Sequence, residues 1–246
     1  MIRSFLKNLP RLGVFLLALL PVLIGGFILV SIYGGEVNEI SQPVDIIRRG
    51  SYPYAIIGHI LGGSALLLLG YLQFSNRLRI KFPKWHRWVG RGLVAAGCYL
   101  ALSGLWMNQS VQAQPDSWLH DTAQNIAAVG LLTVLSLGLY FIRSGNITKH
   151  RIWMTRAYAL CLGTGTQTLL LLPVALIFGP PNGLLGDLVF IAGWIVNLVV
   201  AELFLRKSRR PHYKLSELLA TSDYSQPRAN EEQVWLNGAA VGKEIL

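Results

Sequence analysis

Long apolar runs separated by short polar connections dominate the chain. Six of these runs are long enough to cross the hydrocarbon core of a bilayer, which takes about 20 helical residues. They cover approximately residues 12–32, 54–75, 88–108, 122–142, 152–177 and 184–205. Because short connections favour antiparallel neighbours, we expect helices two to five to form a four-helix bundle. The pattern predicts an all-α, polytopic membrane protein, with a six-helix transmembrane domain over residues 1–205 and a basic, polar tail over residues 206–246.

The composition agrees with this fold class. Hydrophobic residues make up 52% of the 246 residues and charged residues only 14%, too few charges to cover the surface of a soluble protein of this length. The first apolar run has nearly the full spanning length, and Ile32-Tyr33-Gly34-Gly35-Glu36 after it contains no small-x-small cleavage site. We therefore expect the first run to be a transmembrane helix and not a cleaved signal peptide.

The basic residues fall almost entirely on one side of the predicted membrane. All of the 22 Lys and Arg residues except Arg48 and Arg49 lie in the N-terminal segment, the 2–3 and 4–5 connections, the adjoining helix ends or the tail. Positively charged short loops stay in the cytoplasm, so both termini are expected there. This asymmetry is typical of a multi-pass protein of the cell membrane, and here it favours a bacterial inner membrane.

The formal charge of +10 does not indicate a nucleic-acid partner. The charge sits at helix ends, where anionic lipid head groups lie, and no aromatic and basic platform accompanies it. The expected partner is therefore the lipid bilayer. Cys98 and Cys161 fall in the middle of predicted helices, which favours apolar packing over a disulfide or a metal site.

Four of the five histidines lie at or near the starts of helices two to five: His59, His86, His120 and His150. Successive helices run in opposite directions, so the starts of helices two and four face outward and those of helices three and five face the cytoplasm. His59 and His120 therefore share one depth, and His86 and His150 share another. Each pair is carried by helices that can be diagonal partners in a four-helix bundle.

This placement is what bis-histidine haem ligation requires, because a six-coordinate haem takes one imidazole from each side of its plane. Two such pairs predict two haem b groups, able to carry an electron from a cytoplasmic donor (quinol, ascorbate or a reduced protein) to an outer acceptor. Guanidinium groups beside the inner pair suit the haem propionates. These cofactor-binding candidates are Arg87, Arg91, Arg151 and Arg156.

Other interpretations stay open. A histidine near a membrane interface often serves only as an interface residue or a helix-end hydrogen bonder. Zinc is less consistent with the pattern, because the histidines divide between two faces without a compact ligand motif. A small-solute or lipid transporter would line its path with intramembrane polar groups, although no inverted repeat is evident. The candidate groups are Gln73, Gln167, Asn197 and Glu202. A membrane scaffold subunit without a cofactor is the third hypothesis.

Two strings around the inner histidines are distinctive. They are Gln73-Phe74-x-x-x-Leu78-Arg79-x-x-x-Pro83-x-x-His86-Arg87-x-x-Gly90 and His150-Arg151-x-Trp153-Met154-x-Arg156. With them the chain resembles, over roughly residues 54–165, a bacterial family of multi-pass membrane proteins of unknown function. That resemblance implies no established activity.

A more distant resemblance is to the ascorbate-reducible transmembrane di-haem cytochromes b, which share the six helices, the cytoplasmic ends and the histidines on helices two to five. It implies an outer haem held by His59 and His120 and an inner haem held by His86 and His150. In that family basic residues near the 2–3 connection receive cytoplasmic ascorbate. The residues in the corresponding region here are Lys81, Lys84 and Arg87. The candidate ligands of this chain lie nearer the helix ends than in that family.

Overall fold

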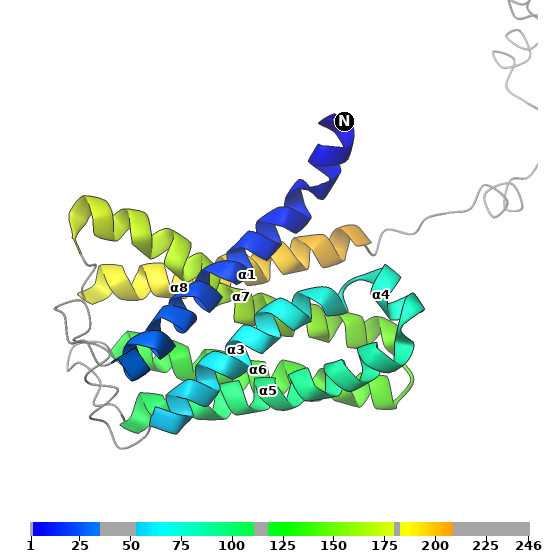
Figure 1. Ribbon diagram of the computed structural model, residues 1–246, viewed down its shortest axis with the longest axis horizontal. Helices are drawn as coiled ribbons and strands as arrows, with labels where there is room; N and C mark the ends of the chain where they lie inside the picture. Colours follow the sequence, from blue (N-terminus) through cyan, green and yellow to red (C-terminus); the bar gives the residue numbers. More distant parts are fainter. Residues whose placement is uncertain (1, 35–52, 111–117, 180–182, 209–246) are drawn as a thin grey trace, which may run out of the picture. The chain divides into compact units, whose positions relative to one another are not determined.

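The computed structural model describes residues 2–34, 53–110, 118–179 and 183–208. This part of the chain is helical, without strands (Figure 1). Its helices are α1 (Ile2–Gly34), α3 (Pro53–Gln73), α4 (Asn76–Lys81), α5 (Pro83–Ser110), α6 (Trp118–Arg143), α7 (Ile147–Phe178) and α8 (Gly183–Ser208). Six of them are long and apolar enough to cross a membrane, which confirms the predicted all-α, six-span fold class. The short helix α4 lies in the connection between α3 and α5.

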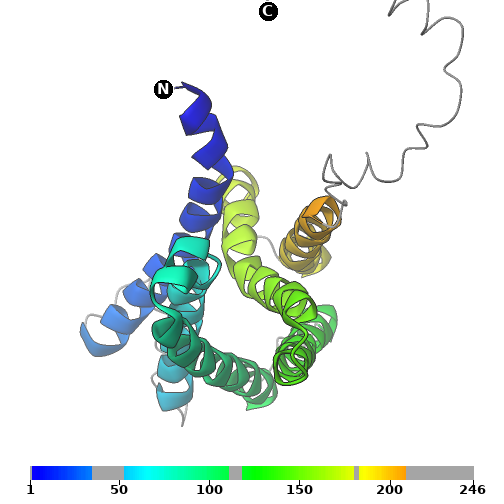
Figure 2. The ribbon, with the colours of Figure 1, turned by 90° about the vertical axis from the view of Figure 1, so that its right-hand side faces the viewer.

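Helices α3, α5, α6 and α7 form the predicted four-helix bundle. Each packs against the next in this order, and α7 closes the ring by contacting α3. Figure 2 shows these helices almost end on, with α1 beside the bundle. Helix α1 contacts α3 and α7. The bundle centre is filled by buried side chains from the four helices and α1, among them Leu66, Leu93, Leu131, Leu135 and Tyr158.

Helices α5 and α7 begin before the apolar runs that predicted them, and local signals explain both starts. Pro83 occupies the first position of α5, where its fixed φ suits a helix and its missing N–H costs nothing. Asn146 caps α7, because its side chain accepts a hydrogen bond from the Lys149 amide at 2.9 Å. His86 and His150 therefore lie in the first turns of their helices, with their own amides bonded back to the preceding turn.

The outer surface of the helices is apolar. Large hydrophobic side chains are exposed on every long helix, as the hydrocarbon core of a bilayer requires. Examples are Phe27, Leu61, Val129, Leu176 and Phe204. The chain is therefore an integral membrane protein by both sequence and structure. The division into a domain over residues 1–205 and a tail stays a prediction, since residues 209–246 lie outside the described residues.

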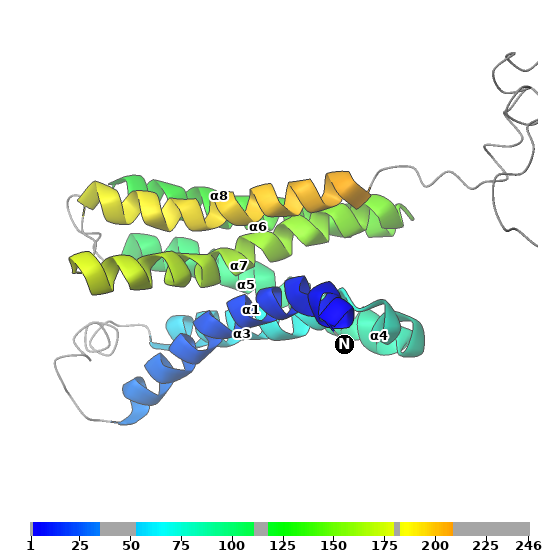
Figure 3. The ribbon, with the colours of Figure 1, turned by 90° about the horizontal axis from the view of Figure 1, so that it is seen from above.

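Helix α8 lies beside α6 and α7 (Figure 3) and is attached by polar contacts within the apolar domain. The Asn197 amide donates to Thr166 Oγ1 at 2.7 Å and to the Gly193 carbonyl at 2.8 Å. Gln167 of α7 donates to the Phe190 carbonyl at 2.9 Å. Hydrogen bonds of this kind hold transmembrane helices together where lipid competes for apolar contact.

An ion pair also joins α7 and α8, nearer the start of α7 and the end of α8. Arg156 Nε donates to Glu202 Oε1 at 2.5 Å, and the same guanidinium lies over the Trp153 ring at 4.4 Å. Glu202 thus has a partner on another helix. Three of the four polar residues considered for a transport path, Gln167, Asn197 and Glu202, are used to attach α8.

Glycine lets α1 approach α7 closely. A Cβ at Gly165 would overlap the backbone carbonyl of Leu17, which cannot move aside as a flexible side chain can. We expect Gly165→Ala to lower the free energy of unfolding by about 1–3 kcal/mol, the usual cost of overpacking. Thermal unfolding in detergent measures the change. Gly92→Ala is the matched control, since nothing lies within 4 Å of a Cβ there; equal stability of the two variants would contradict the close α1–α7 contact.

The inward orientation of both termini, predicted from the charge pattern, is testable at two exposed positions. In a Cys98→Ala, Cys161→Ala background, we expect a membrane-impermeant maleimide to label Tyr54→Cys in intact cells, because the start of α3 faces outward. Arg77→Cys in α4 should react only after the cells are opened, since the basic connection stays in the cytoplasm. Labelling of Arg77→Cys in intact cells would show that the topology is the opposite of the predicted one.

Candidate functional site

A cavity of about 430 Å³ lies within the helical domain, at the end where α3, α6 and α8 begin. Side chains from all six long helices line it, and most of its wall is apolar. The few polar lining residues are His59, Ser64, Gln124, Thr164, Gln167 and Thr168. A largely apolar cavity with a few converging polar groups is the usual form of a cofactor or small-molecule site.

His59 of α3 lines this cavity and is held by α5. Its Nδ1 lies 2.8 Å from Ser103 Oγ, and the Ser103 hydroxyl donates its own proton to the Leu100 carbonyl at 3.1 Å. A hydroxyl has only one proton to donate, so Ser103 accepts at its oxygen and His59 donates from Nδ1. The ring is therefore the Nδ1–H tautomer, and its Nε2 carries the lone pair.

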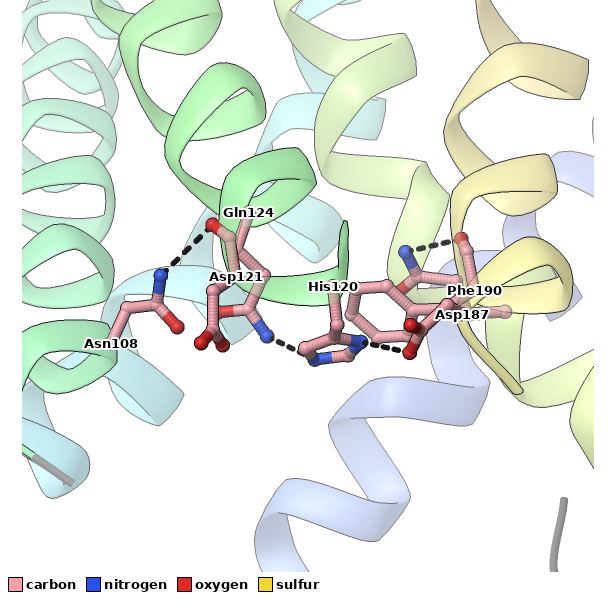
Figure 4. Close-up of polar contacts among 7 residues, drawn as sticks. Asn108, His120, Asp121, Gln124, Asp187 and Phe190 are labelled. Atoms are coloured by element: carbon pink, nitrogen blue, oxygen red, sulfur yellow. Dashed lines mark hydrogen bonds and ion pairs between the residues drawn. The ribbon is translucent and has the colours of Figure 1, made fainter. Parts of the chain in front are cut away.

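His120 of α6 is held between two side chains (Figure 4). Its Nε2 lies 2.7 Å from Gln124 Nε2, and an amide nitrogen can only donate. The His120 proton is therefore on Nδ1, which faces Asp187 Oδ1 of α8 at 3.8 Å. The ring also packs against Phe190, with 4.2 Å between centroids. His120 does not itself line the cavity, but its Nε2 faces Gln124, which does.

The other two histidines meet at the opposite end of the bundle. His150 Nδ1 lies 2.8 Å from the Gly138 carbonyl of α6, which can only accept, so His150 is also an Nδ1–H tautomer. His86 of α5 lies within electrostatic reach of His150 and of Arg79. The predicted inner pair is therefore close together, carried by α5 and α7 on opposite sides of the four-helix ring.

The four candidate arginines differ in their surroundings. Arg87 and Arg151 are exposed and make no ion pair within the described part of the chain. Arg91 is exposed and lies over the Trp88 ring at 5.2 Å. Arg156 is engaged by Glu202. The guanidinium groups of Arg87, Arg91 and Arg151 are thus open to a carboxylate ligand near the inner pair. The guanidinium group of Arg156 is already paired with the Glu202 carboxylate.

Near the inner pair lies a buried amide without a partner. Gln73 Nε2 is shielded from solvent and makes no hydrogen bond to any described group. The Gln73 carboxamide oxygen would lie 3.7 Å from a Cβ at Gly90, one helical turn beyond His86 on α5. A buried donor left open inside a membrane domain is costly unless a ligand satisfies it.

Sequence reasoning missed three residues of the outer end. Ser103 and Asp187 contact histidines that are distant in sequence, so only the folded arrangement reveals them. Gln124 follows His120 by four residues on one helix, and this spacing was a usable signal for a contact. No group of three or more His, Cys, Asp or Glu side chains gathers among the described residues, as a compact zinc site would require. Bis-histidine ligation of one haem needs only two such side chains.

Residues 56–205 match the family model described as Predicted membrane protein (DUF2306). The match covers more than half of the chain, so the protein belongs to this family of multi-pass membrane proteins. All four candidate histidines fall within the matched residues. No curated protein and no solved structure matches the chain.

The His59–Ser103 contact is open to a direct test. We expect Ser103→Ala to lower the free energy of unfolding by about 1 kcal/mol, the usual contribution of one hydrogen bond, and to let His59 exchange between its two tautomers. Thermal unfolding in detergent and ¹⁵N NMR of histidine-labelled protein measure the two effects. Ser64→Ala is the control, because Ser64 lines the same cavity without a hydrogen bond from its side chain to any described residue. A fixed His59 tautomer in Ser103→Ala would contradict the assignment.

Proposed function

We propose that this member of the DUF2306 family is a transmembrane electron carrier with two haem b groups. His59 and His120 would ligate the outer group, and His86 and His150 the inner one. The observation that carries the proposal is the shared state of three of these rings. His59, His120 and His150 all carry the proton on Nδ1 and the lone pair on Nε2, and in His120 that lone pair accepts from the Gln124 amide.

This state is the one that a metal-ligating histidine needs. A ligating imidazole offers one nitrogen to the metal and donates its other N–H to a hydroxyl, a carbonyl or a carboxylate, which fixes the tautomer and the ring orientation. The groups that face Nδ1 here are the Ser103 hydroxyl and the Gly138 carbonyl, each at 2.8 Å, and the Asp187 carboxylate at the longer distance of 3.8 Å. His59 and His150 therefore resemble ligating histidines in the hydrogen bond that holds Nδ1–H, while the Nε2 of His120 accepts from Gln124.

The apolar cavity at the outer end and His59 on its wall support the outer haem site. The cavity is walled mainly by apolar side chains, and a Cβ at Gly104 would lie 3.5 Å from His59 Cε1, so the missing side chain leaves room beside the ring. His120 does not line the cavity, but its Nε2 contacts Gln124, which does. Ligation by His120 therefore requires its Nε2 to exchange the Gln124 amide for the metal.

The inner end fits by its charges and its unpaired donor. His86 and His150 are neighbours across the bundle, and Gln73 Nε2 is a buried donor one turn beyond His86. The Arg87, Arg91 and Arg151 guanidinium groups are suited to the propionates of the inner group. Arg156 contributes less to this charge, because the Glu202 carboxylate already neutralises it.

Haem iron, when bound, would supply the one-electron chemistry. The chain's own residues would bury the groups, orient the imidazoles and place positive charge at the cytoplasmic end. With that orientation, electrons would pass from a cytoplasmic donor to an outer acceptor. A transporter is less favoured, because Gln167, Asn197 and Glu202 serve the α7–α8 contacts.

The proposal predicts the visible spectrum of the protein after expression with a haem precursor and purification in detergent. We expect sharp b-type bands in the reduced-minus-oxidised spectrum. His59→Ala or His120→Ala should remove one component, and His86→Ala or His150→Ala the other, because each variant removes one of the two imidazoles that would hold the group. His212→Ala is the control, since this fifth histidine lies in the predicted tail.

Two results would count against this function. A folded, colourless protein that takes up no added haem would leave the histidines as helix-packing residues and the cavity as a site for another apolar small molecule. Full retention of both spectral components in all four histidine variants would show that haem binds elsewhere.

A further inference from the structure

Asp187 is a buried carboxyl group inside a membrane-spanning helix. It lies in the second turn of α8, and only 7% of its surface is exposed. A carboxylate at such a position is costly unless a partner compensates for it, and ionisable residues inside membrane domains usually have a role.

Its partner is His120. The Asp187 Oδ1 atom lies 3.8 Å from His120 Nδ1, and neither Lys nor Arg pairs with Asp187 among the described residues. The opposite ring nitrogen of His120 accepts from Gln124, so the single imidazole proton is on Nδ1, the nitrogen that lies 3.8 Å from the carboxylate. Phe190, one turn after Asp187 on α8, packs on the same ring. The same helix thus provides both the charge and the apolar contact for His120.

We propose that Asp187 is a positioning residue that fixes the tautomer and orientation of His120, which makes α8 part of the outer site. The proposal rests on the function proposed above. Asp187 would not contact the ligand itself. Its carboxylate would hold Nδ1–H, so that Nε2 is the nitrogen directed toward Gln124 and the cavity.

The attachment of α8 to α7 explains how Asp187 is held in register. Gln167 bonds to the Phe190 carbonyl, one turn from Asp187, and Asn197 bonds to Thr166 further along the two helices. These contacts resist sliding and rotation of α8. Helix α8 lies outside the ring of four helices and would supply Asp187 to the outer site.

A carboxylate at Nδ1–H has an electronic effect as well as a geometric one. It adds a buried negative charge beside the ring, which would favour the oxidised state of a ligated iron. Asp187→Asn keeps the size of the side chain and removes the charge. We expect this variant to raise the midpoint potential of the outer haem and to weaken its retention by about 10- to 100-fold, the usual effect of losing such a partner.

The first test needs no haem. In the haem-free, full-length protein, ¹⁵N NMR should show His120 as the Nδ1–H tautomer, and Asp187→Leu should allow exchange between tautomers because the acceptor is lost. The His120 signals are assigned by their loss in His120→Gln. Asp121→Asn is the matched control, an acid of the same helix end whose side chain makes no contact with His120 among the described interactions. An unchanged His120 tautomer in Asp187→Leu would overturn the proposal.

The second test uses the haem-loaded protein. Spectroscopic redox titration should show an upward shift of the outer midpoint potential in Asp187→Asn, none in Asp121→Asn, and recovery toward the wild-type value in Asp187→Glu. Loaded protein with an unchanged potential in Asp187→Asn would overturn the role of Asp187 and leave the electron-carrier function standing. Wild-type protein that binds no haem would instead remove the proposed function, and the tautomer experiment would still decide whether Asp187 positions His120.

Discussion

Every polar side chain inside a membrane domain must find its hydrogen bonds within the protein, because the surrounding lipid offers none. The arrangement of the histidines follows from this constraint. Each of His59, His120 and His150 binds a group on a different helix through its Nδ1 side, so each ring also fixes the distance and rotation of two helices. In His59 and His150 the other nitrogen keeps its lone pair, and in His120 that lone pair accepts from the Gln124 amide.

The same constraint explains the role of the α7–α8 contacts. Asn197, Gln167 and Glu202 are polar residues in an apolar helix pair, and each is satisfied by a partner across the contact or along the backbone. Apolar packing alone distinguishes poorly between helix registers in lipid. The hydrogen bonds select one register, and that register places Asp187 beside His120. The stability of the helix pair and the geometry of the outer site therefore depend on the same contacts.

The helical fold follows from the sequence because its determinants are local and repeated. Apolar runs of spanning length give the six helices, and short connections give the antiparallel bundle. Each histidine lies in the first two turns of its helix, and the equal depth of the two members of each pair stays a prediction. The contacts of the histidines do not follow, since they depend on the rotation of each helix about its axis. Ser103 and Asp187 are 44 and 67 residues away from their partners, and no periodicity in the sequence connects them.

We propose that the four histidines hold two haem groups, and the haem content of the purified protein tests this proposal. Expression with a haem precursor, followed by conversion of the bound haem to its pyridine complex, gives the number of haem b groups per chain. We expect two haem b groups per folded chain. A folded protein that contains none, and binds none when haem is added, would contradict it.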